Sequence, residues 1–142
     1  MKRVTGIGGI FFKAKDAANM KQWYQQHLGI VSDEGAASFR WREEEQPDNF
    51  GYTVWSVFPN DTKYFAPSTA PFMINYRVAD LDDLLAQLRA EGVEVDDRVE
   101  TYDYGRFAWI TDPEGNRIEL WEPTAIDNNS SPVPENDGSL QQ

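Results

Sequence analysis

The sequence contains no cysteine and a single histidine, His27, and this scarcity excludes several kinds of site. Disulfides, thiolate nucleophiles and cysteine-bound zinc all need thiols. A metal site built from several imidazoles needs more than one histidine, and a Ser-His-Asp triad could use only His27. His27 falls in the last turn of a predicted helix, where a structural role is the simpler interpretation.

Basic residues and long hydrophobic runs are also scarce. The chain has 13 Lys and Arg against 24 Asp and Glu, a net charge of −11, which disfavours nucleic acids and anionic membrane surfaces as partners. The first apolar run ends at Lys13, too early for the core of a signal peptide, and no window approaches the length of a membrane span. We therefore expect a cytoplasmic protein that binds neither nucleic acid nor membrane.

The chain carries one folding pattern twice, over residues 4–60 and again over residues 71–123. Lys13-Ala14-Lys15-Asp16 in the first copy matches Arg77-Val78-Ala79-Asp80 in the second, and each match ends in an aspartate suited to cap a helix. Strands are predicted at residues 4–15, 36–42, 51–58, 71–79, 93–99, 106–111 and 117–122, and helices at residues 17–27 and 81–91. The pattern indicates an internal duplication of a β-α-β-β-β unit.

Duplication predicts the fold class, because one such unit leaves one face of its sheet uncovered. We expect an α+β domain over residues 1–123, in which two βαβββ repeats form a curved mixed sheet around a central cavity. Gly8 and Gly9 within the first strand indicate a bulge or a close approach by another group. Residues 124–142 are polar and proline-rich, and we expect them to form a disordered tail.

The segment from Tyr104 to Pro123 predicts a β-hairpin that carries the main candidate residue. Asp112 to Asn116 has the chemistry of a tight turn, and the strand after it alternates, with Glu119 on its less apolar face. If that face lines a cavity, Glu119 is a metal ligand, a catalytic base or an anchor for a cation. If the face meets water, Glu119 is an ordinary surface residue.

Residues that alternate with the helix-facing ones are expected to line the cavity. The candidate ligand-binding side chains are Phe11, Lys13, Trp55, Met73, Asn75, Arg77, Trp109 and Trp121. In the strand at residues 106–111 the alternation leaves two registers open, one directing Phe107 and Trp109 inward and the other Arg106 and Ala108.

The opening GIGGIFFKAKD, the central YRVADLDDLLAQLRAEGV and the closing DPEGNRIELWEP together resemble the vicinal-oxygen-chelate superfamily of glyoxalase, bleomycin-resistance and extradiol dioxygenase proteins. The resemblance covers Val4 to Pro123, and its most specific part is the closing motif. It implies either an enzyme, namely a lyase, isomerase or dioxygenase, or a binding protein like the bleomycin-binding members. It also implies a homodimer.

The resemblance further implies a divalent ion in the cavity, held by one residue from each of several inward strands. Most of these positions carry no suitable metal ligand here. The ligand on the first strand falls on Gly9, that on the strand opening the second repeat falls near Met73, and a third falls on Trp55 or Ser56. Of the residues that match the ligand positions only Glu119 can serve, and one carboxylate does not hold a catalytic ion. We therefore expect no metal cofactor, unless carboxylates on loops replace the lost ligands.

Two functions remain open at this point. The first is a cup without the metal that binds a small aromatic or cationic molecule through its indoles and Glu119. The second is an enzyme in which Glu119 is a base of raised pKa or holds a metal with other partners. Lys13 and Arg77 suit recognition of a carboxylate or phosphate, or else reach the rim and offset the acidic charge there.

Overall fold

Seven strands form one curved mixed sheet in the computed structural model, which describes residues 3–124. The strands are β1 (Val4–Ala14), β2 (Ala36–Arg42), β3 (Phe50–Pro59), β4 (Phe72–Val78), β5 (Glu94–Tyr102), β6 (Gly105–Thr111) and β7 (Arg117–Pro123), and the helices are α1 (Ala17–Leu28) and α2 (Leu81–Ala90). The strand order is β2-β3-β1-β4-β7-β6-β5. The predicted fold class is confirmed, whereas the predicted tail lies outside the described residues except for Thr124.

Each half of the sheet repeats the same pairings. β1 runs parallel to β3 and β3 antiparallel to β2, just as β4 runs parallel to β7 and β7 antiparallel to β6. The helix between the strands of each parallel pair makes the crossover that parallel pairing requires. In the second half, β5 pairs with β6 and extends the sheet. The first half has an isolated bridge between Asp33 and Ala36 in place of this strand. An antiparallel pairing of β1 with β4 joins the halves.

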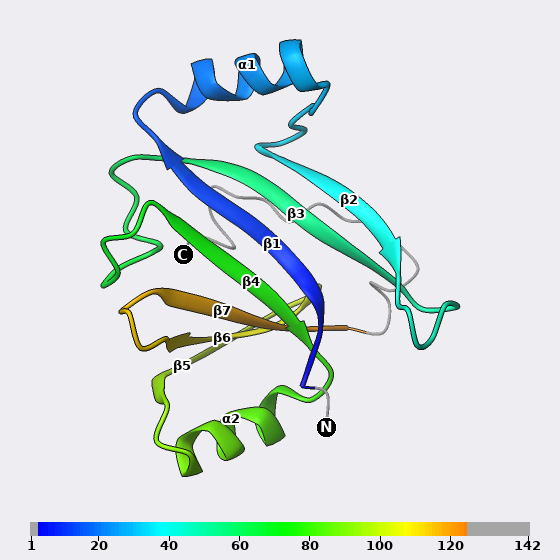
Figure 1. Cartoon of the computed structure of the whole chain (residues 1–142), viewed down its shortest axis with the longest axis vertical. Coiled ribbons are helices and arrows are strands. Elements are labelled where there is room, and N and C mark those ends of the chain that lie inside the picture. The colour runs from blue at the N-terminus through cyan, green and yellow to red at the C-terminus, as the bar shows by residue number, and fades with distance from the viewer. Residues whose placement is uncertain (1–2, 125–142) are drawn as a thin grey trace.

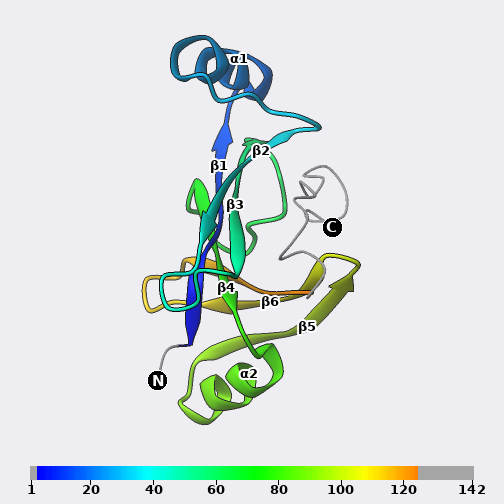
Figure 2. The same ribbon diagram turned by 90° about the vertical axis from the view of Figure 1, so that its right-hand side faces the viewer.

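The two helices lie at opposite ends of the molecule (Figures 1 and 2), and α2 is the better packed. Asp80 caps α2 by accepting a hydrogen bond from the backbone N–H of Asp83 at 3.1 Å. Leu81, Leu84 and Leu85 are buried against side chains of β4, β6 and β7. Both helices pack on the same face of the sheet, which leaves the other face for the cup.

α1 packs more loosely than its pattern predicts. Met20 and Tyr24 contact the sheet, whereas Trp23 and Leu28 are 47% and 60% exposed. The predicted apolar stripe is therefore split between a packed edge and an exposed one.

The pair Gly8-Gly9 marks both a bulge and a close approach. The pairing of β1 with β4 shifts register between Ile7 and Gly9. A Cβ atom on Gly8 would lie 2.1 Å from Oδ1 of Asn75, a distance that real Cβ atoms do not show. The sequence prediction is confirmed, and the group that approaches is the amide of Asn75.

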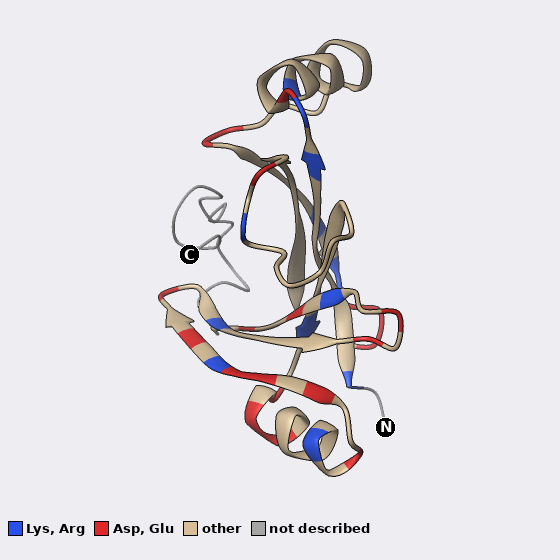
Figure 3. Ribbon diagram, turned by 90° about the vertical axis from the view of Figure 1, so that its left-hand side faces the viewer, with Lys and Arg blue, Asp and Glu red and all other residues tan. Residues whose placement is uncertain are grey.

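Acidic residues gather in one part of the molecule. Figure 3 shows them along β5 and on α2. On β5 they include Glu94, Asp96, Asp97 and Glu100. Neither described helix is long and apolar enough to span a membrane.

Candidate functional site

Glu119 lies fully buried on the cup face of β7, next to the central strand β4. Three hydrogen-bond donors surround its carboxylate. Nδ2 of Asn75 donates to Oε1 at 2.6 Å, and Nε1 of Trp109 donates to Oε2 at 3.0 Å. The hydroxyl of Tyr64 also donates to Oε2. Glu119 is therefore not the surface residue that strand statistics alone would favour.

Strand register explains two of these donors. Asn75 on β4 lies opposite Glu119 in the parallel pair, and Trp109 on β6 lies opposite it in the antiparallel pair. Directly opposite residues in a sheet project their side chains from the same face. The sheet alone thus brings together Asn75, Glu119 and Trp109. The inward orientation agrees with the prediction for Asn75 and Glu119, whereas for Trp109 the sequence left two registers open.

Burial raises the pKa of Glu119 to about 7, because the apolar cup removes the water that stabilises a carboxylate. The hydrogen bonds from Tyr64, Asn75 and Trp109 act in the opposite direction, as does the nearby guanidinium of Arg117. Arg117 is itself held over the ring of Trp109, 5.2 Å from its centroid. At neutral pH both protonation states of Glu119 are populated.

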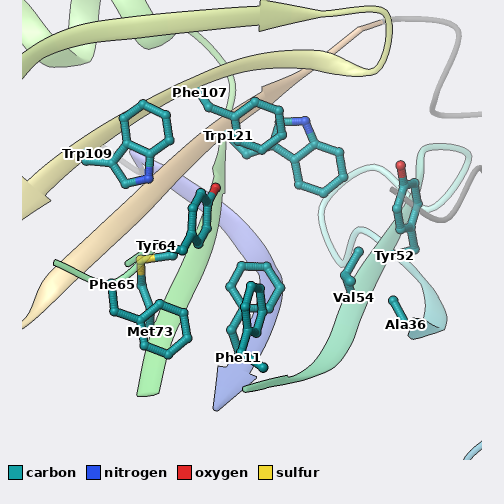
Figure 4. Packing of buried hydrophobic residues seen from close by; sticks show 11 residues of the cluster. Phe11, Ala36, Tyr52, Val54, Tyr64, Phe65, Met73, Phe107, Trp109 and Trp121 are labelled. Carbon is teal, nitrogen blue, oxygen red and sulfur yellow. The ribbon is translucent and has the colours of Figure 1, made fainter. Parts of the chain in front are cut away.

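The third donor comes from the connection between β3 and β4, residues 60–71. Tyr64 and Phe65 of this segment are 6% and 0% exposed, and both belong to the cluster that fills the cup. In Figure 4 the hydroxyl of Tyr64 points toward the side of the cup formed by Trp109 and Trp121. Sequence reasoning assigned no role to Tyr64, and the available signal was two aromatics within a long polar connection.

Most of the predicted wall lies on the cup face. Phe11, Met73, Trp109 and Trp121 are buried in one cluster. Phe107 is in the same cluster, so the register with Phe107 and Trp109 inward is the one adopted. The rejected pair faces the helices instead: Ala108 packs against α2 residues, and Arg106 forms an ion pair with Asp82 at 2.9 Å.

The expected position of Trp55 on the cup wall is wrong. In the parallel pair Trp55 lies opposite Ile10, so both side chains project toward α1, where Trp55 packs against Phe12 and Tyr24. Ser56, the alternative family ligand position, is buried next to it in the sequence, and its Oγ donates to the carbonyl oxygen of Gly35 at 3.2 Å.

Lys13 and Arg77 lie at opposite ends of the antiparallel pair of β1 and β4. Arg77 pairs with Gly6, whereas Lys13 is adjacent to the pair Phe12 and Phe72. The Nζ atom of Lys13 lies 5.5 Å from the ring centroid of Phe65, at the edge of the cup. The two cations therefore cannot hold one small anion between them.

Arg77 is buried inside an aromatic cage. Its guanidinium lies 4.9 Å from the ring centroid of Trp121, 5.4 Å from that of Trp41 and 5.5 Å from that of Tyr52. Arg77 also lines a cleft of about 340 Å³, together with Glu43 and Glu45 of the loop between β2 and β3. Two carboxylates in this cleft disfavour the binding of an anion by Arg77.

The groups around Glu119 do not suit a divalent metal ion. The nitrogen atoms of Asn75 and Trp109 that face the carboxylate carry hydrogens and have no lone pair to give, and the Tyr64 hydroxyl is used as a donor. Within residues 3–124, no group of three or more His, Asp or Glu side chains could hold a metal ion. The site is therefore suited to hydrogen bonding by the Glu119 carboxylate and not to chelation of a metal ion.

The sequence profile of the Glyoxalase/Bleomycin resistance protein/Dioxygenase superfamily matches residues 6–120. The chain belongs to this superfamily. No curated protein matches this glyoxalase-superfamily chain in sequence.

Solved structures of similar fold extend over most of the chain. Methylmalonyl-CoA epimerase from Mycobacterium tuberculosis is 19% identical with a TM-score of 0.60, and the match covers 89% of this chain and 93% of that one. A methylmalonyl-CoA epimerase in complex with methylmalonyl-CoA and ammonium is 20% identical with a TM-score of 0.62, covering 87% and 97%. A protein described as an NAD-dependent benzaldehyde dehydrogenase from Legionella pneumophila is 15% identical with a TM-score of 0.53, covering 82% and 98%. At these identities the similarity shows the fold alone.

Proposed function

We propose that this member of the glyoxalase superfamily binds a small aromatic or cationic molecule in its cup, with Glu119 as the anchor and without a metal ion. The observation that carries the proposal is the fully buried carboxylate of Glu119 inside an aromatic wall. A buried carboxylate is retained at a cost in stability, so a role in recognition accounts for its presence.

The chemistry of the wall specifies the ligand class. Phe11, Phe107, Trp109 and Trp121 present aromatic surface, which contacts flat rings and the faces of cations favourably. The carboxylate of Glu119 accepts hydrogen bonds and attracts positive charge strongly in a site without water. A ligand that combines an aromatic ring with an N–H donor, an O–H donor or a positive charge suits both the aromatic wall and the carboxylate.

Binding is tested by thermal shift and calorimetry with benzylammonium, benzyltrimethylammonium, indole and 4-methylphenol. We expect at least one compound to raise the melting temperature of the wild type, and Glu119→Gln to weaken its binding about ten-fold or more, since hydrogen bonds to charged groups contribute about 1.5–3 kcal/mol. Glu122→Gln is the matched control and should bind as the wild type does, because Glu122 is a partly buried glutamate on the helix face of β7, where it accepts a hydrogen bond from the backbone N–H of Leu81 at 2.7 Å. Absence of binding by all four compounds contradicts the proposal.

The proposed absence of a bound metal ion is tested separately. Elemental analysis of the purified protein should show no stoichiometric divalent metal, and added zinc, nickel or manganese should leave the melting temperature unchanged. A bound metal that is lost in Glu119→Ala would overturn this part of the proposal.

The second candidate is an isomerase in which Glu119 removes a proton from a carbon acid. A pKa of about 7 suits a general base at neutral pH, and two of the similar structures are methylmalonyl-CoA epimerases. Incubation of carbon acids with the protein in deuterium oxide, followed by proton NMR, tests this candidate. Exchange that is no faster with the wild type than with Glu119→Gln excludes it.

A further inference from the structure

The segment 60–71 is held over the cup by side chains and by its two ends. It contains 12 residues between β3 and β4, a length at which connections commonly serve as lids or binding loops. The hydrogen bonds of its backbone within the described chain stay inside the segment, except at its ends: the N–H of Thr62 reaches Pro59, and the carbonyl oxygen of Pro71 accepts from Lys13. The contacts that close the cup are therefore made by Tyr64 and Phe65.

Inside the cup, Tyr64 makes the kinds of contact that we expect of a bound aromatic ligand. Its ring stacks parallel to Phe58, with centroids 5.8 Å apart and an interplanar angle of 3°. The ring meets Trp109 edge to face, at 6.4 Å and 90°. Its hydroxyl donates to the carboxylate of Glu119, the central acceptor of the site.

We propose that Tyr64 is an internal stand-in for the ligand, and that the ligand is a single-ring aromatic molecule with a neutral O–H or N–H donor that displaces Tyr64 as the segment 60–71 opens. This inference rests on the proposed function and narrows it from aromatic or cationic molecules to neutral aromatic donors. A neutral donor replaces the Tyr64 hydroxyl one for one. A ligand without a donor leaves the buried Glu119 oxygen with one hydrogen bond fewer, which disfavours it.

Displacement has a consequence for affinity. The wild type binds only when Tyr64 has left the cup, so its apparent dissociation constant is increased by the inverse of the fraction of open molecules. Removing the Tyr64 side chain removes this competition and leaves a space with the shape of a phenol. The same opening exposes the peptide bond after Lys63, whose side chain is already exposed, to trypsin.

The experiment compares 4-methylphenol, which reproduces the tyrosine side chain, with toluene, which lacks the donor. Dissociation constants are measured by calorimetry for the wild type, Tyr64→Ala, Glu119→Gln and Tyr24→Ala. Tyr24 is a partly buried tyrosine on the helix face of the sheet, where its ring lies 4.9 Å from that of Trp55, so Tyr24→Ala is the matched control. In parallel, the rate of tryptic cleavage after Lys63 is followed by mass spectrometry in wild type with and without each compound.

We expect 4-methylphenol to bind Tyr64→Ala about ten-fold or more tightly than it binds the wild type, and to bind the wild type more tightly than toluene does. Glu119→Gln should lose the preference for 4-methylphenol over toluene, and Tyr24→Ala should retain it. In the wild type, 4-methylphenol should accelerate cleavage after Lys63 and toluene should not. The cleavage assay uses the wild type alone, so it remains decisive if Tyr64→Ala does not fold.

Equal affinity for 4-methylphenol and toluene, or binding of 4-methylphenol without faster cleavage after Lys63, would overturn the inference. Binding of benzyltrimethylammonium through Glu119 without binding of 4-methylphenol would also overturn it, while leaving the proposed function intact. Absence of binding by every compound would remove the proposed function together with the inference.

Discussion

Glu119 shows how neighbouring strands determine the character of one residue. Isolated on a strand, it is an ordinary glutamate, but its neighbours Asn75 and Trp109 and the overlying Tyr64 convert it into a buried acceptor with three donors. Burial raises its pKa from 4.5 to about 7, because desolvation exceeds the effect of the hydrogen bonds. The same shift makes stability depend on pH.

The folded protein binds more protons at Glu119 than the unfolded chain does between pH 4.5 and pH 7, the interval of its pKa shift. The free energy of unfolding contributed by this group therefore falls as the pH rises through the interval and is constant above it, a loss of about 3 kcal/mol. Urea unfolding from pH 4.5 to pH 8 should show this fall in the wild type, after subtraction of the Glu119→Gln profile. Glu122→Gln, on the helix face of β7, should behave as the wild type does. Identical profiles for wild type and Glu119→Gln would contradict the expectation.

Gly8 gives a second prediction for a single residue. A methyl group at Gly8 would collide with Oδ1 of Asn75, and it would lie 3.0 Å from side-chain atoms of both Arg77 and Trp121. Gly8→Ala should lower the free energy of unfolding by about 1–3 kcal/mol through overpacking, and should weaken ligand binding because Asn75 shifts from Glu119. Gly92→Ala is the control: Gly92 has φ of +84° and open space around it, so that variant should lose stability and keep binding.

The sequence predicted the site in part, and the failures have physical causes. Glu119 and Trp121 could be assigned to one face of their strand because the hairpin has a recognisable turn and the strand after it alternates clearly, whereas two registers stayed open for the strand with Trp109. Trp55 was assigned to the wrong face because β3 is apolar on both faces, with Tyr52 and Phe58 on one and Trp55 on the other. The sequence of such a strand does not indicate which of its residues face the cup. Tyr64 could not be placed because a connection has no periodicity from which orientation follows.

At the scale of the elements, caps and glycine stops located both helices, and alternation located the strands. What these patterns did not predict is how firmly each helix packs. α2 buries three leucines against the sheet, whereas no α1 side chain is fully buried. α2 lies beside β5 as well as β6 and β7, whereas α1 lies beside β1 and β3.

Because α2 packs more firmly than α1, we expect side-chain truncation in α2 to lower the free energy of unfolding more than truncation in α1. Leu85→Ala in α2, where the side chain is 3% exposed, should cost about 2–5 kcal/mol of the free energy of unfolding. Leu28→Ala in α1, where the side chain is 60% exposed, should change it by no more than about 0.5 kcal/mol. Denaturant unfolding of both variants provides the measurement, and equal losses would show that α1 packs as firmly as α2.

For the whole molecule, the homodimer remains a prediction. Trp23, Leu28 and Val31 are 47%, 60% and 59% exposed in or just after α1, an apolar exposure that association would cover. Sedimentation velocity over a range of concentrations should reveal a species of two chains. A single-chain species at every concentration from micromolar upward would contradict the prediction.

The antiparallel pairing of β1 with β4 makes the order of the two halves along the chain immaterial to the sheet. Val4 pairs with Val78, and Arg77 beside it pairs with Trp121, so the start of β1 and the end of β7 lie two strands apart. That gap is about 10 Å, which a peptide of three or four residues spans. A circularly permuted gene that begins at β4 and ends at β3 would therefore encode every strand pairing of the original, and it would open the cup by severing the segment that carries Tyr64.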